Sequence, residues 1–580
     1  MTGTTPQRVQ ARPSRLSSLV YAAKVTAFRT RRAAIDAASG PPRLIRLAAL
    51  GPIEVAAESR TPLWSDPSAA EQTMQLGKVH NLRIACRALD ELIIPAGAIF
   101  SFWRQVGPPI ASRGYVQGRM LQQGCMVAVV GGGLCQLSNA LYDVALQAGC
   151  RIVERHPHSR IVLGSAAEFG RDATVAWNYV DLRFVSDRAL RLSARLDQNS
   201  LCIRLAAPLA GAAPPAARSP PPPSPARSVS TARSCASCDE TDCFLHEPSA
   251  TTAAPGVRAF LVDEAWPEFQ DHVRTVRGSE DRLGLPFAGA RLGLARYAWP
   301  PDGFEHVRSA PIASLRRTLA LRGVGPQGSA RRAAELVGAG RISAAIASLL
   351  TPEVTTVTVA QSYLPYLWRD GLLGGREVSV LMSRLPLAVL QARLDAAAAA
   401  HPQHPSLADF RAPAWLAQAE AEALAEAAWI ITPHAEIANL FGQRTVRLPW
   451  WSPPQRRTDA RHVRRIAFVG PTVARKGAHL VREAALALGL EVMPLGPELE
   501  GDAFWRGVRI VPTDDWTSVT VVVQPALVED QPRRLLAALA AGVPVVATEA
   551  CGIDPQAGLT LIPPNDPAAL IKALEDLIAA

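Results

Sequence analysis

Residues 131–138 read Gly131-Gly132-Gly133-Leu134-Cys135-Gln136-Leu137-Ser138. After the glycines, apolar residues recur three or four positions apart as far as Ala148, which is the spacing of one helix face. This pattern predicts that Cys135 lies in the first turn of a helix. Unpaired backbone N–H groups and the positive end of the helix dipole meet there and favour a thiolate.

The next elements place histidines after this helix. We expect the helix to end near Gly149 and residues 151–154 to form a short strand that leads to His156 and His158. A glycine-rich turn, a cysteine at a helix start and a histidine on the next strand is one way to build an activated thiol. The alternative is structural, because cysteines commonly pack as small buried hydrophobes and a glycine run also makes a tight turn.

The composition indicates a folded, basic, multidomain protein. At 580 residues the chain is too long for one core, and 48% apolar residues is ordinary for globular domains. The net charge of +10 suits acidic partners such as nucleotide phosphates or an anionic membrane surface. We expect no nucleic-acid partner, because no basic patch interleaved with aromatic residues is present.

The compartment is predicted from what the chain lacks. The sequence shows no apolar run long enough to span a bilayer and no signal-peptide pattern, and it holds nine cysteines, an odd number. These features predict reduced thiols in the cytoplasm. The first fifty residues carry nine Lys or Arg against the single acid Asp36, which indicates either a solvated basic arm or a peripheral contact with anionic lipid.

The front half is predicted to be a basic segment, residues 1–70, followed by a mixed α+β domain, residues 71–205. In this domain we expect a helix running through Leu92, a strand beginning at residues 170–175, and a closing hairpin made by residues 190–196 and 201–205.

Several motifs in this domain recur in order and together resemble the VanW family over residues 75–187. They are Phe100-Ser101-Phe102, Val106-Gly107-Pro108, the 131–138 stretch, Leu141-Tyr142, Glu154-Arg155-His156-Pro157-His158-Ser159, Asp172-Ala173-Thr174-Val175 and Asn178-Tyr179-Val180-Asp181-Leu182. The resemblance implies an association by name with glycopeptide resistance and the cell envelope. It implies no defined biochemical activity.

An acidic residue after the histidines completes a catalytic pattern. A Cys at a helix start, then His, then Asp is similar to the order in papain-like and transglutaminase-like thiol enzymes. We therefore predict Cys135 as nucleophile, His158 as base with His156 as the alternative, and Asp172 as the residue that orients the histidine with Asp181 as the alternative. The alternative is that the histidines and Asp172 are structural hydrogen-bonding residues of a binding module.

Residues 206–255 read as a proline-rich linker that contains a cysteine and histidine cluster. Cys235, Cys238, Cys243 and His246 follow a C-x2-C-x4-C-x2-H spacing, which offers four soft ligands. Zinc is the default metal and an iron–sulfur cluster the second. The spacing is not that of a standard finger, so incidental thiols in a disordered linker are the alternative.

The back half is predicted to be α/β throughout, as two Rossmann-type lobes at residues 256–455 and 456–580. Four segments of the second lobe resemble the nucleotide-sugar-binding half of retaining group 1 glycosyltransferases of the GT-B fold. They are Arg465 to Gly470, Ala474-Arg475-Lys476-Gly477, Leu535 to Thr548 and Gly558 to Asp566.

The resemblance implies a donor site. A glycine and lysine turn after the first strand would place Gly470, Arg475 and Lys476 against a diphosphate. Glu529 stands at the first position of the family's paired-glutamate motif. Alternatively, Lys476 and Glu529 are solvated surface residues.

Two positions depart from the family's pattern. The second glutamate position is Ala537, and Pro471 replaces the arginine that usually follows the strand glycine. These departures mean either that the donor is held differently or that the domain keeps the fold without the activity.

The sequence thus predicts a nucleotide-sugar-dependent glycosyltransferase fused to a VanW-like module and acting on a cell-envelope glycan or cell-wall precursor. Two alternatives remain open at this point. One is a non-catalytic envelope-biogenesis protein with a degenerate GT-B domain, and the other is a Cys-dependent acyl-transfer enzyme centred on Cys135.

Overall fold

The computed structural model forms two compact units. It describes residues 14–46, 52–65, 69–122, 125–158, 160–161, 166–209, 228–229, 233–234, 243, 256–289, 295–454, 464–501, 503–511 and 518–579. Unit 1 contains the chain up to residue 257 with short pieces at 351–355 and 370–376, and unit 2 contains the remainder.

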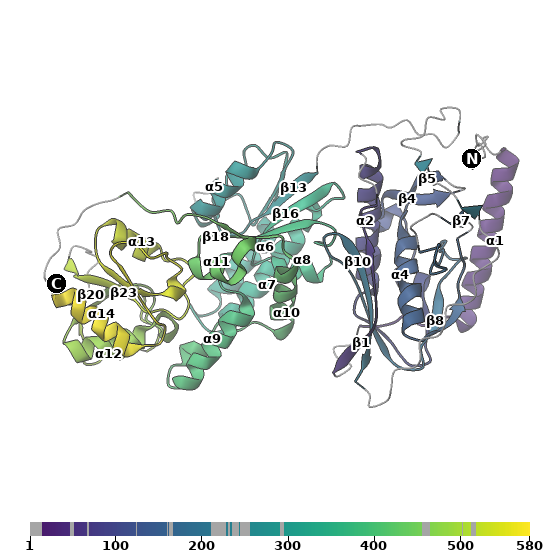
Figure 1. Ribbon diagram of the computed structural model, residues 1–580. Helices are drawn as coiled ribbons and strands as arrows, with labels where there is room; N and C mark the ends of the chain where they lie inside the picture. The colour runs from purple at the N-terminus through teal and green to yellow at the C-terminus, as the bar shows by residue number, and fades with distance from the viewer. Residues whose placement is uncertain are drawn as a thin grey trace, which may run out of the picture. The chain divides into compact units, whose positions relative to one another are not determined.

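Unit 1 is a mixed α+β domain (Figure 1). Its helices are α1 (Arg15–Ser39), α2 (Ala69–Leu89), α3 (Phe102–Val106) and α4 (Leu134–Gln147). Its strands are β1 (Ile53–Pro62), β2 (Leu92–Ile94), β3 (Ile99–Ser101), β4 (Gln117–Gln122), β5 (Cys125–Val130), β6 (Arg151–Glu154), β7 (Arg160–Ile161), β8 (Arg183–Val185), β9 (Leu190–Leu196), β10 (Ser200–Pro208), β11 (Ser228–Val229) and β12 (Arg233–Ser234).

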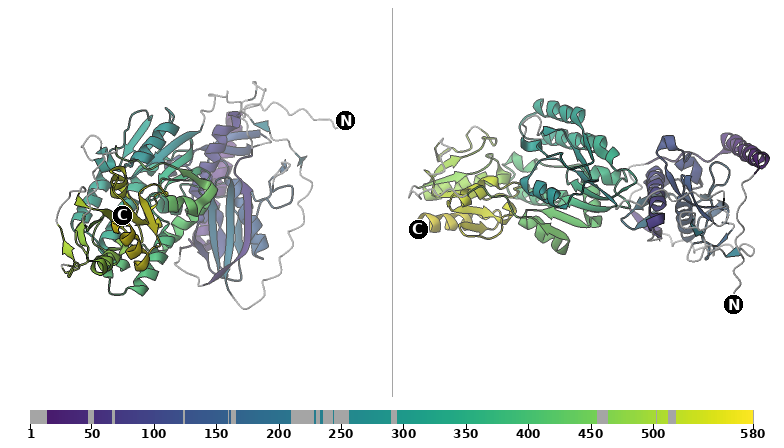
Figure 2. Two further views of the ribbon diagram at one scale, coloured as in Figure 1. Left: turned by 60° about the vertical axis from the view of Figure 1, so that its left-hand side comes forward. Right: turned by 90° about the horizontal axis from the view of Figure 1, so that it is seen from above.

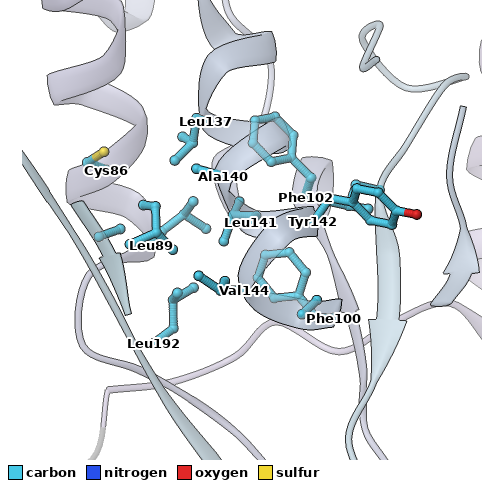
Figure 3. Close-up of a cluster of buried hydrophobic side chains, with 14 of the residues drawn as sticks. Cys86, Leu89, Phe100, Phe102, Leu137, Ala140, Leu141, Tyr142, Val144 and Leu192 are labelled. Carbon is cyan, nitrogen blue, oxygen red and sulfur yellow. The ribbon is translucent and has the colours of Figure 1, made fainter. Parts of the chain in front are cut away.

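The main sheet of unit 1 is antiparallel, with the order β1-β10-β9-β2. Strand β9 alternates buried and half-buried residues along its length, so one face of the sheet is turned to the core. Helices α2 and α4 pack on this sheet, and their apolar side chains fill the core that Figure 3 shows around Leu89, Leu137 and Leu141. The helix that carries Cys135 is therefore held by the main core.

Several predicted elements of unit 1 are confirmed. Helix α4 contains Cys135 as its second residue, β6 spans the expected residues 151–154, and β9 and β10 form the closing hairpin. Two expectations were wrong. Helix α2 ends at Leu89, and Leu92 begins a strand instead. Residues 171–175 form no strand, because their backbone groups bond to neighbouring loops and side chains, as described below for the site.

Residues 1–70, which the sequence predicts to be a basic segment, contain a helix and a strand that belong to the domain. Strand β1 pairs antiparallel with β10 along most of its length, and α1 joins the domain through ion pairs of Arg32 with Glu154 and of Asp36 with Arg183. Helix α1 still exposes Leu16, Leu19 and Tyr21. The predicted contact of this segment with anionic lipid remains a prediction.

Unit 2 contains two lobes with helices on both sides of each sheet (Figures 1 and 2). The first lobe has β13 (Val257–Leu261), α5 (Pro267–Val276), β14 (Arg282–Leu285), β15 (His306–Ser309), α6 (Pro311–Arg322), α7 (Ser329–Ile346), β16 (Val354–Ala360), α8 (Leu364–Arg369), β17 (Glu377–Leu381), α9 (Leu387–Ala400), α10 (Ala414–Glu426), β18 (Trp429–Thr432), α11 (Ala435–Phe441) and β19 (Thr445–Arg447). The second has β20 (Arg465–Phe468), α12 (Ala478–Leu488), β21 (Glu491–Pro494), β22 (Arg509–Ile510), β23 (Val521–Gln524), α13 (Arg533–Ala540), β24 (Val545–Thr548), β25 (Leu559–Ile562) and α14 (Pro567–Ala579).

Both sheets have the doubly wound topology. Their orders are β15-β14-β13-β16-β17-β18-β19 and β22-β21-β20-β23-β24-β25, so in each the chain starts in the middle and reverses direction once. The paired strands run parallel. Ligands of such sheets bind beyond the carboxyl ends of the strands at the reversal point. That point lies between β13 and β16 in the first lobe and between β20 and β23 in the second.

No helix in the described part of the chain combines the length and the apolar character needed to cross a membrane. Among the described residues, Cys86, Cys135, Cys202, Cys243 and Cys551 are free cysteines.

The start of α4 gives a test of the fold. Gly133 has φ +102°, and a Cβ at this position would lie 2.3 Å from Lys78 Cγ, whereas Gly97 has φ +75° with open space around it. We expect Gly97→Ala to cost about 1 to 2 kcal/mol through its backbone conformation alone, and Gly133→Ala to cost more. Urea unfolding measures both, and hydrogen exchange in 134–147 should rise only in Gly133→Ala. Equal exchange in the two variants would contradict this account.

Candidate functional sites

The thiol of Cys135 lies at the amino end of α4, directly after the glycine turn. Gly133 caps the helix, and a Cβ on Gly132 would lie 2.1 Å from the carbonyl oxygen of Gly118, so the turn has no room for a side chain there. Cys135 is half-buried. The first amides of a helix have no acceptor within the helix and concentrate partial positive charge. The local backbone therefore favours the thiolate form of Cys135.

His158 and Asp172 are joined by two hydrogen bonds. The His158 ring, through Nδ1, lies 2.9 Å from Asp172 Oδ2, and the backbone N–H of His158 donates to the same oxygen at 2.6 Å. Asp172 is fully buried. The ring of His158 also interacts with the Cys135 thiol, because a hydrogen bond between the two side chains contributes to the pKa shift of each.

Arg155 holds the carboxylate from the other side. Its guanidinium donates to Asp172 Oδ1 at 2.8 Å and to the Asp172 carbonyl oxygen at 2.8 Å. It also lies over the ring of Tyr142, which belongs to α4, with 5.2 Å to the ring centroid. Arg155 thus ties Asp172 to the helix that carries the cysteine.

The charges in this cluster shift the pKa values of Cys135 and His158 in the directions that favour an ion pair between them. Burial raises the pKa of Cys135, but the hydrogen bond and charge of His158 and the Val175 backbone outweigh it, so the thiol pKa is lowered. Burial lowers the pKa of His158, but its bonds to Asp172 and Cys135 outweigh burial and raise the pKa to about 9. Both shifts favour a thiolate beside an imidazolium.

The alternative residues are held by other partners. The His156 ring lies 3.2 Å from Glu154 Oε1 and is half-exposed. Asp181 accepts hydrogen bonds from the hydroxyl of Ser101 at 2.6 Å and from Nε of Arg183 at 2.8 Å. Of the predicted combinations, the structure brings together Cys135, His158 and Asp172.

Unit 2 contains a cavity of about 370 Å³ where the two lobes meet. Part of its lining lies beyond the carboxyl ends of the central strands. This part includes Asp263 after β13, Gln361 after β16, Arg384 after β17, Lys476 after β20, and Glu529 after β23. This is the position that the strand order dictates for a ligand.

Lys476 and Glu529 form an ion pair in the wall of this cavity. The ammonium group of Lys476 lies 3.0 Å from Glu529 Oε2 and donates to the Val528 carbonyl oxygen at 2.9 Å. Gln524 donates to the same Glu529 oxygen at 2.5 Å, and the backbone N–H of Gln531 donates to the other at 3.0 Å. Both predicted side chains are thus half-buried and preorganised at the cavity.

Arg475 and Gly470 are not among the described residues that line the cavity. Arg475 is buried, donates to Gln327 at 2.9 Å and stacks on Phe410 with 4.5 Å to the ring centroid, and burial lowers its pKa. A Cβ on Gly470 would lie 3.3 Å from Gln524 Nε2 and 3.9 Å from Lys476 Cγ. Arg475 and Gly470 therefore support the turn that carries Lys476 without lining the cavity.

His434 links the lobes through the backbone of Glu529. Its Nδ1 accepts the N–H of Ile437 at the start of α11, and its Nε2 lies 3.0 Å from the Glu529 carbonyl oxygen. Burial lowers the pKa of His434, which keeps the ring neutral. The ring caps a helix and holds the residue that faces the cavity.

The predicted metal site is outside the part of the chain that the structure describes, except for Cys243. Cys235, Cys238 and His246 are not among the described residues. Within the described ranges no group of three or more His, Cys, Asp or Glu is placed to hold a metal ion. The zinc or iron–sulfur assignment remains a prediction.

Sequence reasoning missed several residues at both sites. Arg155 belongs to the motif at residues 154–159, but no role was predicted for it. An arginine directly before a candidate catalytic histidine could have been expected to pair with a nearby carboxylate. Asp263, Gln361 and Arg384 follow buried strands directly, so the rule that ligands bind at strand ends could have found them. No local signal marks the backbone of Val175.

The fold and the cavity define the class of the back half as the GT-B fold, with two Rossmann-type lobes around an inter-lobe site. Comparison with family models identifies two regions of the chain. Residues 77–206 match the model described as VanW like protein, and residues 500–580 match glycosyl transferases group 1. The chain thus combines a VanW-like domain with a group 1 glycosyltransferase domain.

Two curated proteins are similar to the front half. An uncharacterized protein of Bacillus subtilis, YoaR, is 36% identical over 105 residues, which are 18% of this chain and 34% of that protein. The vancomycin B-type resistance protein VanW of Enterococcus faecalis is 32% identical over 133 residues, or 22% of this chain and 48% of that protein. The matches therefore span about a third and about half of these relatives.

Solved glycosyltransferase structures are similar to the back half in fold alone. Sucrose-phosphate synthase of Thermosynechococcus elongatus is 15% identical, with 56% of this chain and 90% of that chain covered and a TM-score of 0.35. Anabaena HepE, solved in complex with UDP and glucose, is 15% identical with the same coverage and a TM-score of 0.32.

Arg155 allows a test of the thiol cluster. Removing one partner of a buried ion pair leaves the other charge uncompensated, so we expect Arg155→Ala to destabilise unit 1 by about 3 kcal/mol. The matched control is Arg171→Ala, which breaks the more exposed pair with Asp143 and should cost less than about 1 kcal/mol. Urea unfolding measures both losses. Similar small losses would show that Arg155 does not carry the buried carboxylate.

Proposed function

We propose that unit 2 transfers a glycosyl group from a nucleotide-sugar to a hydroxyl of a cell-envelope glycan precursor. The observation that carries the proposal is the Lys476–Glu529 pair, which lines a cavity at the carboxyl ends of β20 and β23. An ammonium group and a carboxylate side by side match the two parts of the donor, because one suits a diphosphate and the other suits sugar or ribose hydroxyls.

Donor binding rearranges charge at this pair. Lys476 is already held at 3.0 Å from Glu529 and close to a backbone carbonyl, so little side-chain ordering remains when the diphosphate arrives. The diphosphate competes for the ammonium group. Glu529 then accepts a hydrogen bond from a hydroxyl of the donor. The side chain of Gln524 and the backbone N–H of Gln531 keep the carboxylate in position.

In this proposal Lys476, and not Arg475, is the cation on the diphosphate. Arg475 is buried against Phe410 and hydrogen-bonded to Gln327, which belongs to the first lobe. We assign it the role of fixing the turn that presents Lys476.

The acceptor is assigned by class. The first lobe supplies one wall of the cavity with both acidic and basic side chains, among them Asp263, Glu264, Arg317 and Arg384. Such a wall suits a polyhydroxylated acceptor through mixed hydrogen bonds. The presence of a VanW-like domain in the same chain, together with a relative named for vancomycin resistance, supports a precursor of the cell envelope.

A nucleoside diphosphate tests the donor site. UDP, GDP and ADP are compared by thermal shift, because a ligand that binds only the folded state raises the unfolding temperature in proportion to the logarithm of its concentration over Kd. We expect one of them to stabilise the chain and Lys476→Ala to weaken its binding by about tenfold or more, equivalent to about 1.4 kcal/mol. Glu529→Gln should retain the diphosphate but weaken the nucleotide-sugar.

The matched control is Lys572→Ala, which removes an exposed lysine of α14 in the same lobe and should leave binding unchanged. Release of nucleoside diphosphate from the stabilising nucleotide-sugar then measures transfer or hydrolysis. Binding without any release would favour the non-catalytic alternative. Absence of stabilisation by every nucleotide would contradict the donor site itself.

A further inference from the structure

We propose that the VanW-like domain is a second enzyme, in which Cys135 attacks the carbonyl carbon of a carboxamide, His158 moves the proton and Asp172 orients His158. This proposal does not depend on glycosyl transfer by unit 2. It rests on the convergence of three separate segments of the domain, around Cys135, His158 and Asp172.

The three side chains come from the start of α4, from the loop after β6, and from the loop before Ala173. The His158 ring lies 2.9 Å from Asp172 Oδ2 through Nδ1, and its hydrogen bonds to both Asp172 and Cys135 raise its pKa. The loop is locked to the helix, because Ala173 donates its N–H to Asn139 at 2.8 Å and accepts from Ser138 at 2.5 Å. Cysteine and histidine are thereby held in place by the helix itself.

A purely structural role does not account for this arrangement. Burying a carboxylate, a guanidinium and an imidazolium costs desolvation free energy that well-packed apolar residues would not incur. The chain contains cysteines in ordinary structural settings for comparison. Burial raises the pKa of Cys551 to about 12, and burial together with Asp197 raises the pKa of Cys202 to about 12. Cys135 is shifted in the opposite direction by a bonded histidine.

The proposed reaction balances with two co-reactants, a carboxamide and a second nucleophile. The thiolate forms a C–S bond with the carbonyl carbon, the C–N bond breaks, and His158 gives its proton to the leaving amine, which leaves a thioester on Cys135. Water or an amine then attacks the thioester, His158 takes its proton, and the thiolate leaves. The products are a carboxylic acid or a new amide, and the site returns to its first state.

The oxyanion that forms during attack is placed by the backbone. It lies at the start of α4, where the first amide N–H groups have no acceptor within the helix. Gly132 and Gly133 let this turn pack directly against the backbone of Gly118 and the side chain of Lys78. The same turn that fixes the fold of the domain therefore also sets the position of these amide groups.

Iodoacetamide tests the thiol in the full chain, with each cysteine followed by peptide mass spectrometry. At pH 7 we expect Cys135 to react about 100-fold faster than Cys202, because the thiolate is the reactive form. His158→Gln should move the pH dependence of Cys135 alkylation up to the ordinary thiol range near 9. Cys202→Ser is the matched control and should leave Cys135 unchanged. Equal rates at Cys135 and Cys202 would overturn the proposal.

p-Nitrophenyl acetate tests acyl transfer. We expect a burst of one nitrophenolate per chain and a hydroxylamine-labile acetyl group on Cys135, both lost in Cys135→Ser and slowed in Asp172→Asn. Circular dichroism checks that the variants fold. If Cys135→Ser does not fold, His158→Gln is used instead and should also lose the burst. Fast alkylation without an acetyl adduct would overturn acyl transfer.

The pH dependence separates the two roles of the pair. His158 has its pKa raised to about 9, so its imidazolium is present below that value and is lost above it. Turnover that needs an acid for a leaving amine should therefore fall above about pH 9, while alkylation continues because the thiolate persists. A fall in both together would show that the domain unfolds, and no fall in turnover would contradict the acid role.

Discussion

The complete burial of the Asp172 carboxylate is the constraint on which the front domain depends. A buried charge must be paired and hydrogen-bonded, and here its partners are the guanidinium of Arg155 and the backbone and ring of His158. Those contacts fix residues 155–158 relative to 172. Since the neighbouring Ala173 is bonded to α4 through Ser138 and Asn139, satisfying one carboxylate also brings a histidine to the first turn of the helix.

In unit 2 the ligand site is determined by the topology of the two sheets. Each doubly wound sheet reverses its strand order beside its first strand, so the carboxyl ends of β13, β16, β20 and β23 open onto the same cavity. Residues far apart in sequence, such as Asp263 and Glu529, become neighbours of one ligand site. His434 supports this arrangement from the first lobe by holding the carbonyl group of Glu529.

Local patterns predicted the elements well, because glycine turns and apolar periodicity act over a few residues. The helix start at Cys135 and the strand at 465–468 are examples. The preference for His158 over His156 had no firm basis in the local pattern, since both follow the same strand two residues apart and only tertiary contacts with Glu154 or Asp172 distinguish them. Residues 171–175 looked like a strand, yet Thr174 bonds to His156 and Ala173 to a side chain of α4. Strand β1 was missed because its partner β10 lies far along the chain.

The role of Arg475 likewise depends on Phe410 and Gln327, which no short sequence pattern connects to it.

The two departures from the group 1 pattern, Pro471 and Ala537, remove an arginine and a glutamate from the second lobe. The cavity nevertheless retains both kinds of charge. Asp530 lies beside Glu529 in the lining, and Arg384 of the first lobe reaches within 3.9 Å of Asp530. The wall of the cavity thus carries the charges of Glu529, Asp530 and Arg384, and neither Pro471 nor Ala537 is among its described lining residues. Because the electrostatic requirement of a nucleotide-sugar concerns the charges around the cavity and not the chain positions that supply them, the substitutions by themselves do not imply an inactive lobe.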